Sequence, residues 1–198
     1  AIVTDLTAPV QTKNELGENY GMVAWGGAIA EWDAQAAALA SYAVGKTIDE
    51  LKNGDIDMTT GKAKDGTDLQ SSATIYLAGY VYAIEAAVNN AQYLGAAAGD
   101  TLSLVTINSV SGSTAATAEK AGSVSVNTTM CAVTLDDAGK IVAVQFDVVQ
   151  PKAAFDATGA AGEFDAAPLS KNEIKEGYGM KAISPIGLEW YEQMDKLE

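Results

Sequence analysis

A cluster of acidic and hydroxyl side chains lies in the first half of the chain, immediately before an apolar stretch. It comprises Asp68, Ser71, Ser72 and Thr74. Serine and threonine hydroxyls at such a place can cap the first turn of a helix, with Ser71 or Thr74 as the N-cap. They can also bind or carry a ligand group. Capping alone accounts for the pattern, and the ligand-binding interpretation stays open beside it.

The charged residues exclude several kinds of chemistry. The chain has 198 residues, of which 12 are basic and 26 acidic, so its net charge is −14. Every basic residue is a lysine, and neither arginine nor histidine occurs. Catalysis or metal binding by histidine is therefore excluded. A nucleic-acid partner is not expected, since no basic stripe is present. The many carboxylates indicate a solvated acidic surface, and we expect no catalytic residue and no metal site.

The sequence also indicates cysteine pairing, membrane spans and the location of the protein. The single cysteine, Cys131, permits no disulfide within the chain. No run of eighteen apolar residues occurs, so no membrane span is expected. The chain begins at Ala1 rather than at methionine, as expected after removal of a signal peptide. This start, together with the acidic, arginine-free and alanine-rich composition, predicts an extracellular or cell-surface protein.

The strongest signal is an internal repeat. Residues 12–39 return as residues 170–197, at an offset of 158 residues. The two copies share a lysine, an asparagine, a glutamate, a Tyr-Gly-Met sequence, a Glu-Trp pair and a glutamine at matching positions. We therefore expect Trp32 and Trp190 to occupy equivalent buried positions. Related elements should stand near both ends of the chain.

The periodicity of apolar residues changes along the chain. It is helical at first and then alternates with period two, with a stop at Pro151 and loop-like residues at 152–169. The sequence therefore predicts an α+β fold, in which an antiparallel sheet built mainly from 101–150 packs with helices over 28–44, 73–94 and 186–197.

The chain is expected to consist of an extended N-terminal segment, 1–11, and a single module, 12–198. Pro9 ends any strand pairing in the segment. Its apolar side chains have no partner that the sequence identifies, so we expect them to pair with a neighbouring subunit. These candidate assembly residues are Ile2, Val3, Leu6 and Val10.

The hydroxyl cluster also resembles a known family. The segment 68–74, Asp-Leu-Gln-Ser-Ser-Ala-Thr, is similar to the Asp-x-x-Ser-Gly-Ala-Thr signature of FMN-binding domains in Rnf-type and sodium-pumping quinone reductase complexes. The resemblance implies FMN esterified to Thr74, with Asp68, Ser71 and Ser72 beside it. Ser72 replaces the family's glycine, and Tyr76 stands where a second serine or threonine is usual. The elements of the family occur here in permuted order.

The repeated motif resembles a second group, the secreted tandem-repeat proteins and lipoproteins of Gram-positive bacteria, whose modules are related to the FMN-binding domain. This resemblance implies an extracellular address and no established activity. Lipid anchoring is not supported, since the chain begins with Ala1 and not with cysteine.

Two functions follow as hypotheses. The first is a structural subunit of an extracellular filament or cell-surface array, without enzymatic activity or cofactor. Its partner is further copies of itself, assembled by exchange of a strand or tail. The alternative is an FMN-binding extracellular electron-transfer module.

Overall fold

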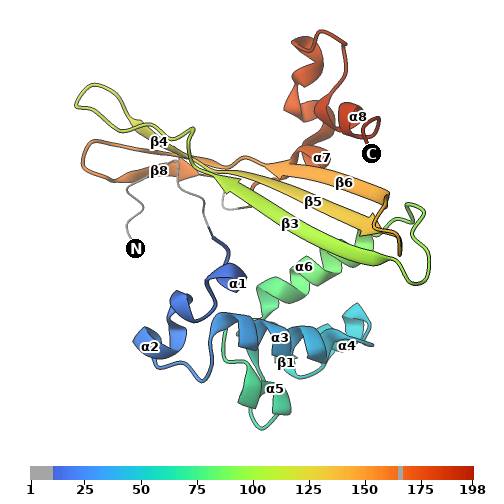
Figure 1. Cartoon of the computed structure of the whole chain (residues 1–198). Helices are drawn as coiled ribbons and strands as arrows, with labels where there is room; N and C mark the ends of the chain where they lie inside the picture. The colour runs from blue at the N-terminus through green and yellow to red at the C-terminus, as the bar shows by residue number, and fades with distance from the viewer. Residues whose placement is uncertain (1–10, 165–166) are drawn as a thin grey trace. The chain divides into compact units, whose positions relative to one another are not determined.

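The computed structural model describes residues 11–164 and 167–198, which divide into two compact units, Gln11–Gln92 and Tyr93–Glu198. The first unit is mainly helical, and the second combines long strands with short helices (Figure 1). The α+β class predicted from the sequence is confirmed. The single module expected over 12–198 stays a prediction. The four candidate assembly residues lie outside the described part of the chain.

The unit Gln11–Gln92 is built on a small apolar core. Its elements are α1 (Lys13–Leu16), η1 (Gly17–Tyr20), α2 (Met22–Gly26), α3 (Trp32–Ala43), α4 (Ile48–Asn53), β1 (Ile56–Asp57), β2 (Lys62–Ala63), α5 (Asp68–Ser72) and α6 (Ala78–Asn89). The core joins side chains from α3, α4, α5, α6 and the short hairpin β1–β2: Leu39, Leu51, Ile56, Ala63, Leu69, Ala73, Leu77 and Val81. Burial of such side chains is the main stabilising contribution in a unit of this size.

The helix expected over 28–44 begins later, at Trp32. Glu31 is extended and is the N-cap residue of α3, but its side chain forms no cap bond to this helix. Its carboxylate accepts hydrogen bonds from the backbone N–H groups of Met22 and Val23 instead. A side chain held in this way fixes the start of the helix.

The helix expected over 73–94 is also shorter and spans Ala78–Asn89. The residues before it are drawn out of the helix because the backbone N–H groups of Thr74 and Ile75 donate to the side chain of Gln35. Neither Ser71 nor Thr74 caps this helix, since its N-cap residue is Leu77.

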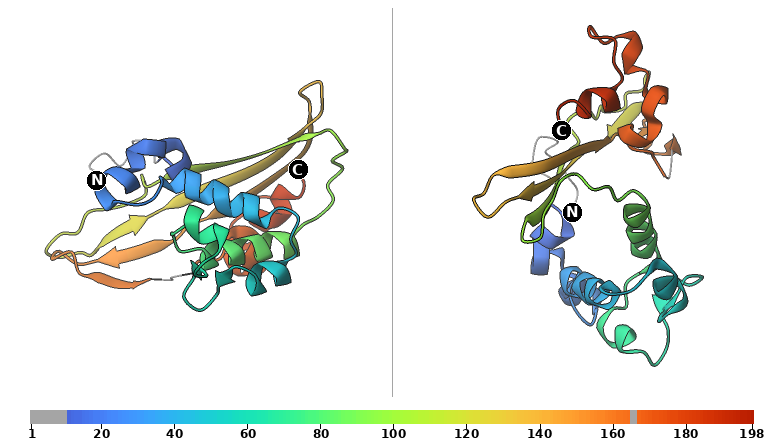
Figure 2. Two further views of the ribbon diagram at one scale, coloured as in Figure 1. Left: turned by 90° about the horizontal axis from the view of Figure 1, so that it is seen from below. Right: turned by 90° about the vertical axis from the view of Figure 1, so that its right-hand side faces the viewer.

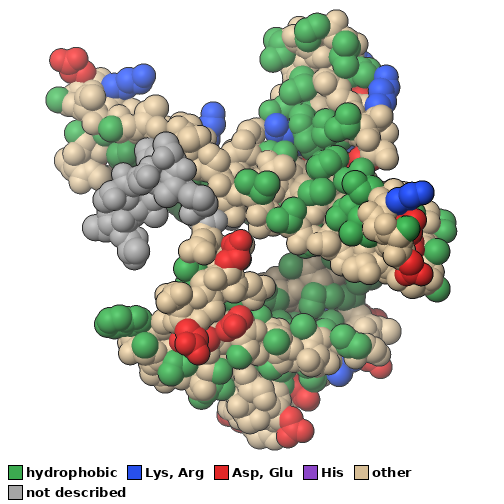
Figure 3. All heavy atoms as spheres, viewed as in Figure 1, with side chains coloured by type: hydrophobic (Ala, Val, Ile, Leu, Met, Phe, Trp, Pro, Cys, Tyr) green, Lys and Arg blue, Asp and Glu red, His purple; other side chains and the backbone are tan. Residues whose placement is uncertain are grey.

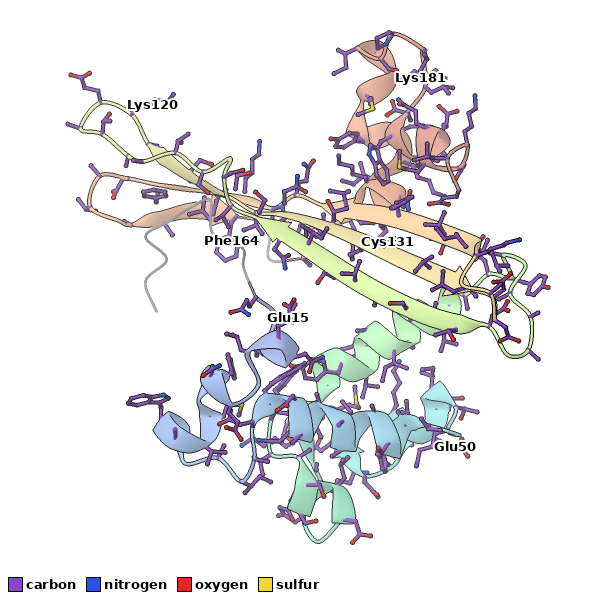
Figure 4. All side chains as sticks on the ribbon, in the orientation of Figure 1. Glu15, Glu50, Lys120, Cys131, Phe164 and Lys181 are labelled. Carbon is purple, nitrogen blue, oxygen red and sulfur yellow. The ribbon has the colours of Figure 1, made fainter. Side chains whose placement is uncertain are left out.

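The unit Tyr93–Glu198 contains two antiparallel sheets. The long sheet has the order β3 (Thr101–Ser109), β5 (Asn127–Leu135), β6 (Ile141–Val149), and the smaller one has the order β4 (Gly122–Ser125), β7 (Lys152–Phe155), β8 (Ala161–Phe164). The period-two prediction for 101–150 is confirmed. Figure 2 shows the long strands side by side as a twisted sheet, and Cys131 lies on its middle strand (Figure 4).

Pairing continues beyond Pro151, so the loop expected at 152–169 contains two strands instead. Proline cannot donate to a ladder, but its carbonyl can accept, and the Pro151 carbonyl accepts from the Val126 N–H at 3.1 Å. The ladder therefore resumes at Lys152 after a short break.

Short helices follow the sheets: α7 (Lys171–Ile174), η2 (Lys175–Tyr178), η3 (Met180–Ala182) and α8 (Trp190–Met194). The helix expected over 186–197 is therefore reduced to α8. Ser184 begins a turn, closed by a hydrogen bond from Gly187 N–H to the Ser184 carbonyl, and Glu189 caps α8. The C-terminal helices lie on one face of the long sheet (Figure 1).

Gly61 holds the start of α6 in place. Its carbonyl accepts from the Leu77 N–H at 2.5 Å, its φ is +71°, and a Cβ at this position would overlap the ring of Tyr76. Only glycine fits both conditions. Gly66, in the same unit, also has a positive φ, +80°, but a Cβ there would meet open space.

We expect Gly61→Ala to destabilise the protein by about 3 kcal/mol, since it adds a steric overlap to the strain of a left-handed residue, which alone costs about 1–2 kcal/mol. Gly66→Ala, the control, should cost only the second contribution. Urea unfolding followed by circular dichroism measures both. If the double variant Gly61→Ala/Tyr76→Ala is no more stable than Gly61→Ala, the overlap with Tyr76 is not the cause.

Candidate functional site

The motif of residues 12–39 begins with a capping box at α1. The Thr12 N–H donates to Glu15 Oε2 at 2.6 Å, and the Glu15 N–H donates to Thr12 Oγ1 at 3.2 Å. These two bonds satisfy both donors at the start of the helix. Hydrogen bonding by Thr12 holds the pKa of the Glu15 carboxyl below its ordinary value. Thr47 and Glu50 form a capping box of the same kind at the start of α4. Figure 4 shows Glu15 on α1 and Glu50 on α4.

Four further side chains complete the motif. The Lys13 ammonium lies over the rings of Tyr20 and Trp32, at 4.9 Å and 5.3 Å from their centroids. Such cation–π contacts hold a lysine on aromatic faces. The Glu31 carboxylate joins the N-terminus of α3 to α2 through its bonds to the Met22 and Val23 N–H groups, at 2.8 and 2.9 Å.

The copy at 170–197 reproduces this geometry position by position. Ser170 and Glu173 form the capping box, and the Lys171 ammonium lies 4.6 Å from the Tyr178 ring centroid and 5.2 Å from that of Trp190. The Glu189 carboxylate accepts from the Met180 and Lys181 N–H groups at 2.8 and 3.0 Å. The sequence repeat is therefore a structural repeat. Trp190 is buried and Trp32 half-buried.

The bonds at the second copy that have no counterpart in the first include two to glutamate carboxylates. The Tyr191 hydroxyl donates to Glu176 Oε1 at 2.9 Å, and this hydrogen bond raises the pKa of Tyr191 to about 12. The Phe146 N–H on β6 donates to the Glu198 carboxylate at 2.8 Å. The first bond lies within the copy, and the second joins the residue after the copy to β6.

Gln35 is the centre of the first copy. Its side chain is fully buried, and its Nε2 donates to the Ala30 carbonyl at 2.7 Å. Its Oε1 accepts from the Thr74 N–H at 2.8 Å, from the Thr74 hydroxyl at 3.3 Å and from the Ile75 N–H at 3.2 Å. The neighbouring Trp32 Nε1 donates to the Tyr80 hydroxyl at 3.0 Å. The first copy is thus fastened to the Thr74 segment and to α6.

Gln193 and Trp190 stand at the same positions in the second copy but lack these partners. Gln193 Nε2 donates to the Leu188 carbonyl at 3.0 Å, as Gln35 does to that of Ala30. Among the described residues, none donates to Gln193 Oε1 and none accepts from Trp190 Nε1. Neither atom is fully buried. The second copy therefore keeps the contacts within the motif and lacks those that Gln35 and Trp32 form with the Thr74 segment and α6.

On the side that faces the sheet, the second copy forms hydrogen bonds that the first copy lacks. The Asn172 amide donates to the Phe146 carbonyl at 3.0 Å, and the Tyr178 hydroxyl donates to Gln150 Oε1 at 3.2 Å. The counterparts in the first copy, Asn14 and Tyr20, are exposed, and their side chains form no hydrogen bond with any residue that the structure describes. Each copy therefore forms the contacts that the other lacks.

The four residues predicted for FMN lie on α5 and directly after it. The Ser71 and Ser72 hydroxyls both donate to the Asp68 carbonyl, at 2.7 and 3.3 Å. Thr67, and not Ser71, caps this helix. Thr74 is exposed, and its hydroxyl donates to Gln35. Sequence reasoning missed Gln35 as the partner of Thr74, although the glutamine recurs in both copies of the repeat.

The fit of this segment to a phosphoester is partial. Thr74 is an exposed residue, but its hydroxyl forms a partly buried hydrogen bond to Gln35, and esterification would remove this one of the three bonds to Gln35. The backbone N–H groups of Thr74 and Ile75 already donate to Gln35, so they do not form a phosphate cradle. The remaining hydroxyls donate to the backbone, and the Asp68 side chain is exposed and anionic.

A polar pocket lies in the unit Tyr93–Glu198. It has a volume of about 260 Å³ and is lined by Ser109, Ser111, Gly112, Ser125, Asn127, Gln150 and Lys152. It contains a buried Asn127 Oδ1 with no hydrogen-bond partner. Its lining contains no carboxylate to pair with Lys152, so no acid–base pair is formed. Over the described ranges, no group of three or more cysteine or acidic residues could hold a metal ion.

Within residues 11–164 and 167–198, none of the helices combines the length and the apolar character needed to cross a bilayer. No known family model matches the chain, and no solved structure matches it. The chain is 40% identical, over an alignment of 87 positions, to the chlorophenol reductase of Desulfitobacterium hafniense. The match covers 37% of this chain and 26% of that protein, so the chain spans about a quarter of this curated relative.

Replacing Gln35 and Gln193 in turn tests whether only Gln35 stabilises the protein through bonds to a distant segment. We expect Gln35→Ala to lower the free energy of unfolding by about 2–3 kcal/mol, because it leaves the partly buried Ala30 carbonyl and the Thr74 and Ile75 N–H groups without their partner. Gln193→Ala, the matched control, should cost under about 1 kcal/mol, since it removes no bond to a distant segment. Urea unfolding at equilibrium measures both. Equal losses of unfolding free energy would contradict this account, because the two glutamines would then stabilise the protein to the same extent.

Proposed function

We propose that this chain is a structural subunit of an extracellular filament or cell-surface array, without enzymatic activity. The observation that carries the proposal is the open edge of the long sheet. β3 spans nine residues, pairs with β5 on one side, and has no strand on its other side among the described residues. A long, apolar, unpaired edge strand is a template for pairing with another chain.

The faces of β3 support the same proposal. Leu102 and Leu104 point to one face and are 72% and 70% exposed, while Ile107 points to the other and is 66% exposed. In the described part of Tyr93–Glu198, the buried apolar side chains are those of Val148 and Trp190. Hydrophobic side chains lie over much of the visible surface of this unit (Figure 3). Exposed apolar area on this scale is typical of an association surface.

The N-terminal segment is the proposed donor. An extended segment that pairs with the edge of β3 gains backbone hydrogen bonds, each contributing about 0.5–1.5 kcal/mol. It also buries Ile2, Val3 and Leu6. Donation from one subunit to the next is heterologous, so it builds an open filament unless a ring closes. The net charge of −14 opposes this association, and salt should therefore promote it.

We expect deletion of residues 1–11, or Ile107→Lys on β3, to abolish polymerisation, because the first removes the donor and the second places a charge on the acceptor strand. Val44→Lys is the control, since Val44 is 80% exposed in the helical unit and outside the proposed contact. Light scattering against salt concentration, with negative-stain electron microscopy, measures assembly. A wild-type protein that stays monomeric at all salt concentrations, or a truncated one that still polymerises, would contradict the proposal.

The alternative, an FMN-binding extracellular electron-transfer module, is supported by two observations. A curated relative that matches part of the chain is named a chlorophenol reductase, and a reductase transfers electrons. Thr74 is an exposed residue and stands at the position where the family signature carries its flavin.

If flavin is attached, the intact mass of the protein expressed in a flavinylating host should exceed that of the bare chain, and the preparation should absorb in the flavin bands. Thr74→Val should remove both signals, whereas Thr60→Val, at an exposed threonine outside the signature, should keep them. A colourless wild-type protein of unmodified mass from that host would contradict the electron-transfer hypothesis.

A further inference from the structure

The polar pocket lies where the two sheets of the unit Tyr93–Glu198 meet. β4 continues into β5 through Val126, and β6 continues into β7 through Gln150 and Pro151. The Val126 N–H donates to the Pro151 carbonyl at 3.1 Å, so the two strand paths stay joined across this break. The pocket therefore belongs to the framework of the unit.

The walls of the pocket come from both strand paths and from the loop between β3 and β4. Ser125 and Asn127 line it from one path. Gln150 and Lys152 line it from the other. Side chains two residues apart on an extended strand point to the same face. The Ser113 hydroxyl fastens the loop, because it accepts from the Ser125 N–H at 3.0 Å and donates to the Ser125 carbonyl at 3.3 Å.

Several polar groups around the pocket have no partner among the described residues. Asn127 Oδ1 is buried and no described residue donates to it. The Ser125 hydroxyl and the Lys152 ammonium form no hydrogen bond or ion pair with any of these residues. Gln150 Oε1 accepts from the Tyr178 hydroxyl, which leaves the Gln150 Nε2 protons free. A buried acceptor without a donor costs free energy, so a bound molecule that donates to Asn127 would be stabilised.

The lining of the pocket defines the charge of that molecule. Lys152 is the one charged residue in the lining, so the pocket suits a ligand with a single negative charge. An amino acid fits less well, because its ammonium group would find no carboxylate there. Asn127 Oδ1 needs a hydroxyl or amine donor, and the serine hydroxyls and the Gln150 amide can bind further oxygens. These groups together suit an acid that carries several hydroxyls.

The volume of the pocket sets the size of the ligand. Its 260 Å³ would hold about nine water molecules at about 30 Å³ each. An inorganic anion would fill only a small part of this space, whereas a monosaccharide matches it. We infer that the pocket binds a sugar acid, a monosaccharide with one carboxylate. Lys152 binds the carboxylate, and Asn127 Oδ1 accepts from a hydroxyl of the sugar.

Isothermal titration calorimetry of the full-length protein with D-glucuronate and D-galacturonate tests this inference. We expect saturable binding of at least one of these acids. The matching neutral sugars, D-glucose and D-galactose, have a hydroxymethyl group in place of the carboxylate and should bind at least about tenfold more weakly. Acetate, which has the carboxylate and no hydroxyl, should also bind at least about tenfold more weakly.

Two variants connect the binding to named side chains. Lys152→Gln should reduce binding of the acid to the level of the neutral sugar, whereas Lys140→Gln, at an exposed lysine outside the pocket, should keep the preference. Asn127→Ala should weaken binding of the acid about tenfold. It should leave the melting temperature of the free protein unchanged, because Asn127 Oδ1 has no described partner to lose.

Absence of binding by both acids overturns the inference, since the pocket would then hold water only. Equal affinity for an acid and its neutral sugar, or an affinity for the acid that Lys152→Gln and Asn127→Ala both leave unchanged, overturns it as well. The inference goes beyond the proposed assembly and does not depend on it. Polymerisation is measured separately by light scattering, so the two proposals can fail independently.

Discussion

One buried side-chain amide organises the helical unit. Gln35 is fully buried on α3, and its two ends bind different segments, the Ala30 carbonyl before the helix and the Thr74 and Ile75 N–H groups far along the chain. An unpaired amide at that depth would cost free energy, so the Thr74 segment must stay extended to supply its donors. The start of α6 and the position of Thr74 both follow from this constraint.

The motif around the glutamine is self-contained. A capping box, a lysine between two aromatic rings and a glutamate that binds two backbone N–H groups recur at 12–39 and at 170–197 with nearly the same distances. These contacts are local in sequence, and they therefore form in two different surroundings. The long-range contacts differ: Gln35 binds the Thr74 segment, and Asn172 binds the sheet. The two copies therefore share their local contacts and differ in the segments they bind.

The features that could be predicted from the sequence rest on periodicity and identity. Alternation over 101–150 predicts the long strands, and the recurrence of Lys, Glu, Trp and Gln predicts the structural repeat. The starts of the helices could not be predicted in this way, because Glu31 and Gln35 take over the N–H groups of distant residues. The strands after Pro151 were missed because a proline that cannot donate still accepts from Val126. The sequence of residues 68–74 resembles a known signature, but Gln35, which binds Thr74, lies about forty residues away in sequence and is identified only by the fold.

The difference between the two glutamines is the central claim, and hydrogen exchange of their side-chain amides tests it on a single unmodified sample. In NMR spectra of the full chain, the Nε2 protons of Gln35 should exchange at least about tenfold more slowly than those of Gln193, because only Gln35 is closed off by a distant segment. Equal exchange rates would contradict the account, since the two copies of the motif would then be equally complete.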